Sequence, residues 1–199
     1  RFKSPVMSGL LVPFLNQKPI VHETAWVAPK ATLIGEVEVG AHAGIWYNVV
    51  LRGDGPGIRV GENTNIQDGV VIHVSSGRQG TVVGRNVTVG HLALLHACEV
   101  QDDSFIGMHS TVLDGAVVET GAMVAAGAVV TPGKVVRKGE LWAGNPARMI
   151  REIRETDLLV FRGSYLHYVE LGKAYRGAPN MFDGSGPAPD FLKGRKSIS

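Results

Sequence analysis

The stretch VQDDSFIGMHSTVLDGAVVETGAMVAAGAVVTPGKVV, residues 100–136, places an aliphatic residue at every sixth position. These positions are Val100, Ile106, Val112, Val118, Val124, Val130 and Val136. A period of six fits neither an amphipathic helix, whose period is 3.6, nor a simple hairpin meander. It is typical of a coil of short parallel strands in which each hexapeptide forms one flat face and one corner.

The same spacing extends toward the N-terminus once two insertions, near residues 55–57 and 76–80, and one dropped residue before Val100 are allowed for. The earlier positions are Val27, Leu33, Val39, Ile45, Leu51, Val60, Ile66, Ile72, Val83, Val89 and Leu95. With three faces per turn, the repeat predicts about six turns and a prism roughly 29 Å tall. A β-sandwich of short strands is the alternative, but it does not explain the six-residue period.

Two kinds of small residue recur at fixed places in the repeat. Four positions after the aliphatic residue stand Ala31, Ala43, Thr64, Ala93, Ser104, Ser110, Ala116, Ala122 and Ala128. One position after it stand Gly40, Gly61, Gly84, Gly90 and Gly107. We expect the aliphatic and small side chains to fill the coil interior, and the glycines to supply unusual backbone angles at corners.

The repeat ends after Val136, and the chain changes character. A turn is expected at Asn145-Pro146, followed by a helix that begins at Thr156 or Asp157, both good N-cap residues. Its apolar face should pack along one side of the prism, and consists of Leu158, Phe161, Tyr165, Tyr168, Val169 and Gly172. The predicted organisation is an N-terminal extension (1–20), the coil (21–140), the turn and helix (141–176), and an extended or disordered tail (177–199).

Composition excludes several classes of protein. The 199 residues are 44% hydrophobic and 19% charged, with a net charge of +2, which gives no electrostatic case for nucleic-acid binding. The single Cys98 excludes an intrachain disulfide and is expected to be a small buried apolar residue. The longest apolar run is far shorter than the ~20 residues of a membrane span. Because the sequence starts at Arg1, we expect a removed leader, and no targeting signal is visible.

Two histidines share one register of the repeat. His73 follows Ile72 and His96 follows Leu95, so both side chains should point outward. Once the insertion is looped out, the two positions are one turn apart, which predicts stacked backbones about 4.8 Å apart. Two imidazole nitrogens bound to one tetrahedral Zn²⁺ lie about 3.4 Å apart, and this stack can provide that separation.

A third histidine, His91, lies on the preceding face, up to about 16 Å along the strand path from His96. We expect that it cannot join the other two within one chain. Around a threefold axis, however, a neighbouring prism could offer its own His91. We therefore hypothesise a metal site shared between subunits, with three imidazoles and an open fourth position, as in catalytic zinc sites. The other histidines are interpreted as surface or hydrogen-bonding residues: His22, His42, His109 and His167.

Three blocks, LRGDG (51–55), NTNIQDGVVIH (63–73) and VTVGHLALLH (87–96), resemble the γ-class carbonic anhydrases, and the likeness covers about residues 19–176. That family has a left-handed parallel β-helix, an all-β fold. The resemblance implies that His73 and His96 of one subunit and His91 of the next hold Zn²⁺, with Fe²⁺ or Co²⁺ as alternatives. It further implies zinc-hydroxide hydration of CO₂ to bicarbonate. It also implies that Gln67, Asn65 and Asp68 lie near the metal, with Gln67 associated with the hydroxide. Arg52 and Asp54 would form an interfacial pair.

The sequence departs from the archaeal members of the family at two positions. Gly55 stands where those members have a glutamate, and Ser76 stands where they have another acidic residue. Both acids serve proton transfer in the family. The resemblance therefore implies a carbonic anhydrase with weak or no activity, even if the metal site is complete.

GELWAGNPAR (139–148) and DGAVVETGAMVAAGAVV (114–130) narrow the resemblance to the γ-carbonic-anhydrase subunits of mitochondrial respiratory complex I in plants, algae and some protists. This implies a homo- or heterotrimer with similar chains on the matrix side of the inner membrane, in contact with membrane-arm subunits. Two alternatives stay open. One is a non-catalytic structural or assembly subunit with a relict metal site, and the other is a hexapeptide acyltransferase that uses one histidine as general base.

Overall fold

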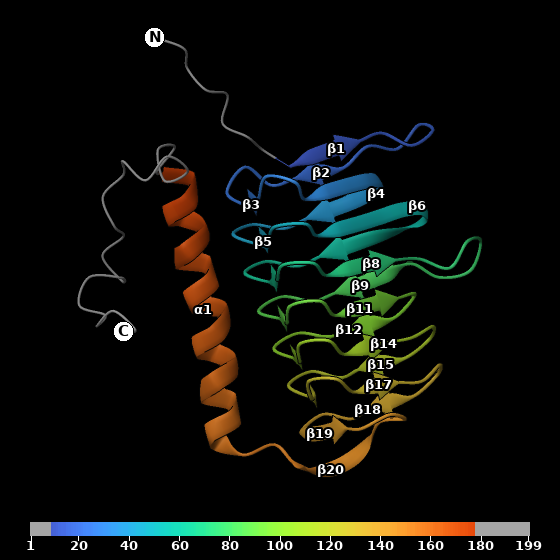
Figure 1. Ribbon diagram of the computed structural model, residues 1–199, viewed down its shortest axis with the longest axis vertical. Helices are drawn as coiled ribbons and strands as arrows, with labels where there is room; N and C mark the ends of the chain where they lie inside the picture. The colour runs from blue at the N-terminus through green and yellow to red at the C-terminus, as the bar shows by residue number, and fades with distance from the viewer. Residues whose placement is uncertain (1–8, 178–199) are drawn as a thin grey trace.

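The computed structural model describes residues 9–177, which form a parallel β-helix with one α-helix along its side (Figure 1). The coil has three faces. The open face contains β1 (Leu10–Val12), β8 (Val71–His73), β11 (Leu94–His96), β14 (Thr111–Val112), β17 (Val129–Val130) and the first halves of β4 (Thr32–Val39) and β6 (Val50–Val60). The long strands β4 and β6 continue round a corner onto the next face.

The two other faces are built in the same way. The groove face contains β2 (Ile20–Val21), the second halves of β4 and β6, β9 (Thr81–Val83), β12 (Glu99–Val100), β15 (Val117–Val118) and β18 (Val135–Val136). The helix face contains β3 (Trp26–Val27), β5 (Gly44–Ile45), β7 (Asn65–Ile66), β10 (Thr88–Val89), β13 (Phe105–Ile106), β16 (Met123–Val124) and β19 (Glu140–Ala143). β20 (Arg148–Glu152) ends this sheet as its antiparallel edge.

The interior confirms the six-residue repeat. Every predicted aliphatic position from Leu33 to Val136 is buried, and Val27 is partly buried at the end of the core. The small residues four positions later, from Ala31 to Ala128, are buried as well. The coil has about seven turns rather than the predicted six. The repeat extends beyond both predicted ends, because β1 and β2 pair in parallel with β4, and β19 pairs in parallel with β16.

The glycines that follow the aliphatic positions have a different role from the predicted one. Left-handed backbone angles occur instead three residues after an aliphatic position, for example at Asn63 (φ 57°) and Gly115 (φ 68°). These residues form the corners. Gly61 has no such angle, but a Cβ added to it would lie 2.5 Å from the Gly84 carbonyl carbon and oxygen in the next turn. The absence of a side chain is needed there because two backbones approach closely.

Helix α1 (Glu155–Gly177) lies along the helix face, as predicted, and begins slightly before Thr156. Its buried residues are Phe161 and Gly172, and Phe161 stacks on Phe105 with ring centroids 5.1 Å apart. Near its C-terminal end, Tyr168 and Tyr175 pack on Trp46, together with Trp26 and Tyr47. The prediction for Leu158 was wrong, because this side chain is 49% exposed.

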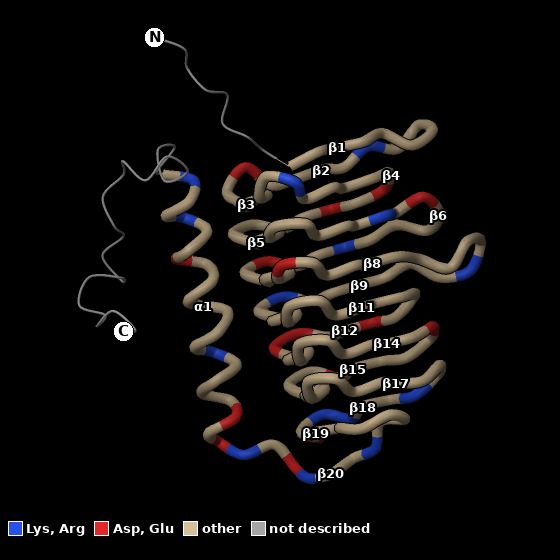
Figure 2. Tube along the Cα trace, in the orientation of Figure 1, with Lys and Arg blue, Asp and Glu red and all other residues tan. Residues whose placement is uncertain are grey.

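Charged residues of both signs are interspersed along the coil and the helix (Figure 2). Within residues 9–177, no helix is long and apolar enough to cross a membrane. The predicted tail lies outside the described residues from position 178 onward.

Candidate metal centre

The open face brings together the two histidines that the repeat placed in one register. His73 on β8 and His96 on β11 are direct cross-strand neighbours. His73 Nδ1 and His96 Nε2 face each other at 3.1 Å, and both rings are partly buried. This separation is close to the spacing of two imidazole ligands on one tetrahedral metal ion.

Each ring is held from behind by a carboxylate. Asp54 Oδ1 lies 3.0 Å from His73 Nε2, and Asp114 Oδ1 lies 2.6 Å from His96 Nδ1. An ionised carboxylate can only accept a hydrogen bond, so these outer ring nitrogens carry the protons in the neutral imidazoles. Each of the two nitrogens that face each other then carries a lone pair and no proton. Two lone pairs directed at one point can both bind one metal ion, and the donor set therefore fits a metal ion.

Both carboxyl groups are kept ionised. Burial opposes ionisation of Asp54, but hydrogen bonds from Arg52 and His73 outweigh burial and lower the pKa of its carboxyl group. Arg52 Nη1 donates to Asp54 Oδ2 at 2.5 Å. The pKa of Asp114 is lowered mainly by its hydrogen bond with His96. Arg52 and Asp54 therefore already form a pair within one chain, which braces His73.

Sequence reasoning missed Asp114. It follows His96 by 18 residues, one more than the 17 that separate the paired residues Leu95 and Val112, because one residue of the repeat is dropped before Val100. An acidic residue one turn after a candidate ligand is a signal that could have been used. The partner of His73 was harder to find, because insertions shift the register between Asp54 and His73.

His91 does not join the pair within one chain. It lies at the corner between β10 and β11, where its Nδ1 is 3.0 Å from Asp68 Oδ2. Gln67 and Asn65 lie beside it, since the His91 backbone N–H donates to Gln67 Oε1 and Gln67 Nε2 donates to Asn65 Oδ1. In the part of the chain that the structure describes, no three metal-ligating side chains converge. The predicted residues thus form two separate groups, one at each edge of the open face.

The two positions that lack the expected acids lie close to each other. A Cβ added to Gly55 would be 3.6 Å from the Cα of Ser76 and 3.3 Å from Val74 Cγ2. Ser76 is exposed in the loop after β8. Neither position offers a proton acceptor beside His73.

The other histidines differ in their surroundings. His22 Nδ1 lies 2.9 Å from Thr24 Oγ1, as expected for a hydrogen-bonding residue. His42 differs from the prediction, because its Nδ1 is buried without a partner among the described residues.

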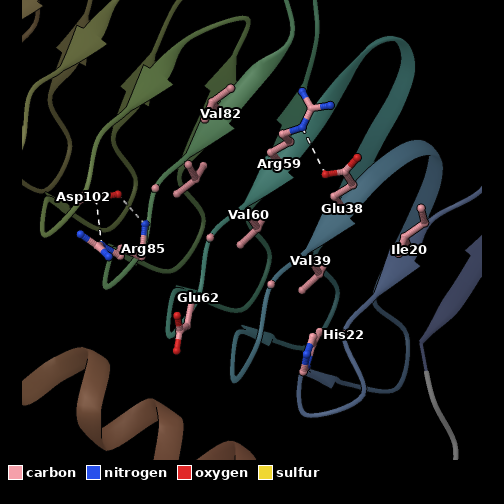
Figure 3. Close-up of a pocket in the computed structure, with 14 residues that line it drawn as sticks. Ile20, His22, Glu38, Val39, Arg59, Val60, Glu62, Val82, Arg85 and Asp102 are labelled. Carbon is pink, nitrogen blue, oxygen red and sulfur yellow. Dashed lines mark hydrogen bonds and ion pairs between the residues drawn. The ribbon is translucent and has the colours of Figure 1, made fainter.

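A groove of about 630 Å³, lined in part by His22, lies on the groove face and includes none of His73, His91 and His96. Its walls carry the ion pairs Arg59–Glu38 and Arg85–Asp102, with apolar residues such as Val60 between them (Figure 3). It includes none of the predicted ligands.

Comparison with known proteins decides the family. The chain is 45% identical over 170 residues to mitochondrial γ carbonic anhydrase 1 of Arabidopsis thaliana, covering 83% of this chain and 62% of that protein. It is 40% identical over 167 residues to a carbonic anhydrase of Geobacillus kaustophilus, covering 84% of this chain and 91% of that protein. The chain belongs to the γ-class carbonic anhydrase family. It spans only 61–66% of the length of the three Arabidopsis relatives.

Among solved structures, a hexapeptide transferase family protein from Anaplasma phagocytophilum superposes with a TM-score of 0.80. It is 46% identical and covers 83% of this chain and 98% of that chain. No family model matches the sequence. For this member of the γ-class carbonic anhydrase family, the relatives imply a metal cofactor in general.

Proposed function

We propose that this protein is a γ-type carbonic anhydrase that converts CO₂ to bicarbonate in a trimer, with one metal ion shared at each boundary between subunits. His73 and His96 of one subunit and His91 of the next would hold the ion, which we propose to be Zn²⁺, with Fe²⁺ or Co²⁺ as alternatives. The observation that carries the proposal is the pair of imidazole nitrogens 3.1 Å apart, with a carboxylate against the far side of each ring.

The open face supports an arrangement between subunits. The histidine pair lies at one edge of this face and His91 at the other, so a symmetric neighbour can bring its own His91 to the pair. Apolar side chains lie uncovered on the face, including Val71 (39% exposed) and, beside His91, Leu92 (53%) and Met108 (55%). Exposed apolar area of this kind is typical of surfaces that pack against another protein.

A divalent metal ion at this site would lower the pKa of water enough to make hydroxide available near neutral pH. The chain itself holds the imidazoles in one tautomer through Asp54 and Asp114, as carboxylates behind metal-binding histidines commonly do. Gln67 presents a buried amide whose oxygen accepts from the His91 N–H and whose nitrogen donates one N–H to Asn65. We propose that the second N–H of this nitrogen orients a polar partner. We propose the same orienting role for Asn65 and Asp68 on this side.

Turnover is expected to be slow. Each hydration cycle releases a proton, and Gly55 and Ser76 provide no acid or base to accept it. A non-catalytic structural or assembly subunit with a relict metal site is therefore the main alternative. With the ring protons on the sides that face Asp54 and Asp114, His73 and His96 present free nitrogens to each other, which favours a site that still binds metal.

We further propose a location in the mitochondrion, on the matrix side of the inner membrane, as a subunit of respiratory complex I. Support comes from the similarity to plant γ carbonic anhydrases whose names include "mitochondrial". The trimer would consist of identical chains or of this chain with similar ones. Purification of complex I with an antibody to this protein, followed by mass spectrometry, tests the partners.

The activity is tested by metal analysis and a stopped-flow CO₂-hydration assay on the purified trimer. We expect about one metal ion per subunit and slow hydration that a chelator abolishes. Full metal loading without hydration would support the structural alternative. Absence of bound metal and of hydration would contradict the proposal.

A hexapeptide acyltransferase is a second candidate, because the Anaplasma relative is named as a transferase. That function requires CoA binding and a general base, and it leaves the carboxylate-backed histidine pair without a role. Isothermal titration with acetyl-CoA distinguishes the two functions. Binding that persists after metal removal would favour the transferase.

A further inference from the structure

A row of hydrogen bonds connects His91 with helix α1. The His91 backbone N–H donates to Gln67 Oε1 at 3.1 Å, and Gln67 Nε2 donates to Asn65 Oδ1 at 3.0 Å. Asn65 Nδ2 donates to Thr88 Oγ1 at 3.0 Å, and the Thr88 hydroxyl donates to Ser164 Oγ at 2.9 Å. Ser164 lies on α1, 76 residues after Thr88. The row therefore connects the corner that carries His91 with a helix from the other end of the chain.

The orientations of the Gln67 and Asn65 amides in this row are fixed by their neighbours. The His91 backbone N–H can only donate, so the Gln67 atom that faces it is the oxygen, and Gln67 offers its nitrogen to Asn65. Asn65 must then accept through Oδ1. At the other side Asn65 Nδ2 lies 3.4 Å from the Val87 carbonyl oxygen, which can only accept. This contact is longer than the 3.0 Å bond to Thr88 Oγ1, so the Thr88 hydroxyl is the closer partner that holds the Asn65 amide at this end.

Water cannot replace a missing partner at the centre of the row. Asn65 is 1% exposed, Thr88 is 1% exposed and Gln67 is 5% exposed. A buried polar group that loses its partner is costly, and neighbouring hydrogen bonds in a row strengthen one another. Loss of one hydroxyl should therefore disturb the whole row.

We propose that Thr88 and Ser164 are positioning residues of the metal centre, and that α1 fixes the orientation of the Gln67 amide through them. The part of this inference that concerns catalysis rests on the proposed function. Without the Ser164 hydroxyl, the Thr88 hydroxyl has to donate elsewhere, and a turned Asn65 amide would offer Oδ1. Asn65 would then present its nitrogen to Gln67 Nε2, and the contact between the two amides would be lost.

The test measures hydrogen exchange at the His91 backbone N–H by NMR in the purified full-length protein. Thr88→Val keeps the shape of the side chain and removes its hydroxyl, while Thr88→Ser keeps the hydroxyl. Ser164→Ala removes the last acceptor. Ser110→Ala is the matched control, since this buried serine donates to the Gly107 carbonyl and has no contact with the row.

We expect exchange about three- to tenfold faster in Thr88→Val and Ser164→Ala, and rates near wild type in Thr88→Ser and Ser110→Ala. In an active trimer, kcat should fall by a similar factor with KM unchanged, because the row acts on the orientation of Gln67. Equal exchange in wild type, Thr88→Val and Ser164→Ala would overturn the inference. A wild-type trimer that does not hydrate CO₂ would contradict the proposed function, and the exchange rates would still decide this inference.

Discussion

At the scale of single residues, the carboxylates behind the histidine pair decide which ring nitrogens are free. Asp114 fixes His96 in the tautomer that presents Nε2, at a distance of 2.6 Å from Nδ1. Asp114→Asn leaves a similar shape but a weaker acceptor. We expect the dissociation constant of the metal to rise about 10- to 100-fold, as for other residues behind metal ligands, measured by competition with a chromogenic chelator.

Asp103→Asn is the matched control, because Asp103 also accepts a side-chain hydrogen bond at a coil corner, from Asn86, but lies away from the histidine pair. Unchanged affinity in Asp114→Asn would show that this carboxylate has no role at the metal.

A second residue-scale prediction concerns glycine. Gly61→Ala places a Cβ against the Gly84 backbone, which cannot move as a flexible side chain can. We expect the free energy of unfolding to fall by roughly 1–3 kcal/mol, measured by chemical denaturation. Gly163→Ala is the control, since a Cβ there meets no atom within 4 Å on helix α1. It should stabilise by roughly 0.5–1 kcal/mol, and equal effects of the two changes would refute the close-approach explanation.

Much of the site at this scale could be predicted from the sequence. The alignment of His73 with His96 follows from the repeat alone, because parallel pairing at a fixed period determines which residues are neighbours. The carboxylate partners could not be predicted in the same way. Asp54 and Asp114 each lie out of the six-residue register with their histidine, so their contacts depend on side-chain reach. The charges of Asp54 and Arg52 also pair equally well in solvent.

At the scale of elements, an ion pair between Arg151 and Asp157, here called the clamp, stabilises the start of helix α1. Arg151 Nη1 and Nη2 donate to the two carboxylate oxygens of Asp157 at 2.6 and 3.1 Å, and the Arg154 N–H also donates to Asp157. These contacts, that of Arg151 first, lower the pKa of Asp157 from its ordinary 3.8 to about 2. The clamp therefore stabilises the folded state above about pH 4, and this contribution is lost as the pH falls toward 2.

We expect Asp157→Asn to be less stable than wild type at neutral pH, with the difference disappearing between about pH 4 and pH 2. Tryptophan fluorescence during urea unfolding at several pH values measures this, because Trp26 and Trp46 pack against α1. Glu155→Gln removes an equal charge from the same helical turn as a control. A difference that stays constant down to pH 2 would contradict the clamp.

The helix also shows where element prediction fails. The sequence suggested Thr156 or Asp157 as the N-cap, but Asp157 instead reaches back to the Arg154 N–H from inside the first turn. Cap preferences identify the residue type near a helix start and leave its position uncertain by a residue or two. Tyr175, beyond the predicted apolar face, packs on Trp26, a contact between distant parts of the chain that a helical period cannot reveal.

At the scale of the whole molecule, the uncovered open face should be the contact surface between subunits. Val71→Arg places a charge at the centre of this apolar area, and burying an unpaired charge is strongly unfavourable. We expect the trimer to dissociate into folded monomers, measured by sedimentation velocity and circular dichroism. Leu159→Arg, on the exposed side of α1, is the control and should leave the trimer intact. An intact trimer in Val71→Arg would mean that the subunits contact each other through another surface.

The fold was predictable at this scale because one repeated interaction builds it, whereas the metal centre shared between chains stays a prediction. A sequence describes one chain, and within one chain His91 lies apart from the histidine pair. We propose that symmetry between chains brings them together.

The most direct test of the shared site mixes two inactive variants. His91→Ala and His96→Ala chains are unfolded together, refolded as mixed trimers and analysed for bound metal by mass spectrometry. In each mixed trimer, one boundary joins an intact His73–His96 pair to an intact His91, so we predict metal in the mixture and none in either variant alone. Metal bound by His91→Ala alone at the wild-type level, or a mixture as empty as its parents, would contradict a centre shared between subunits.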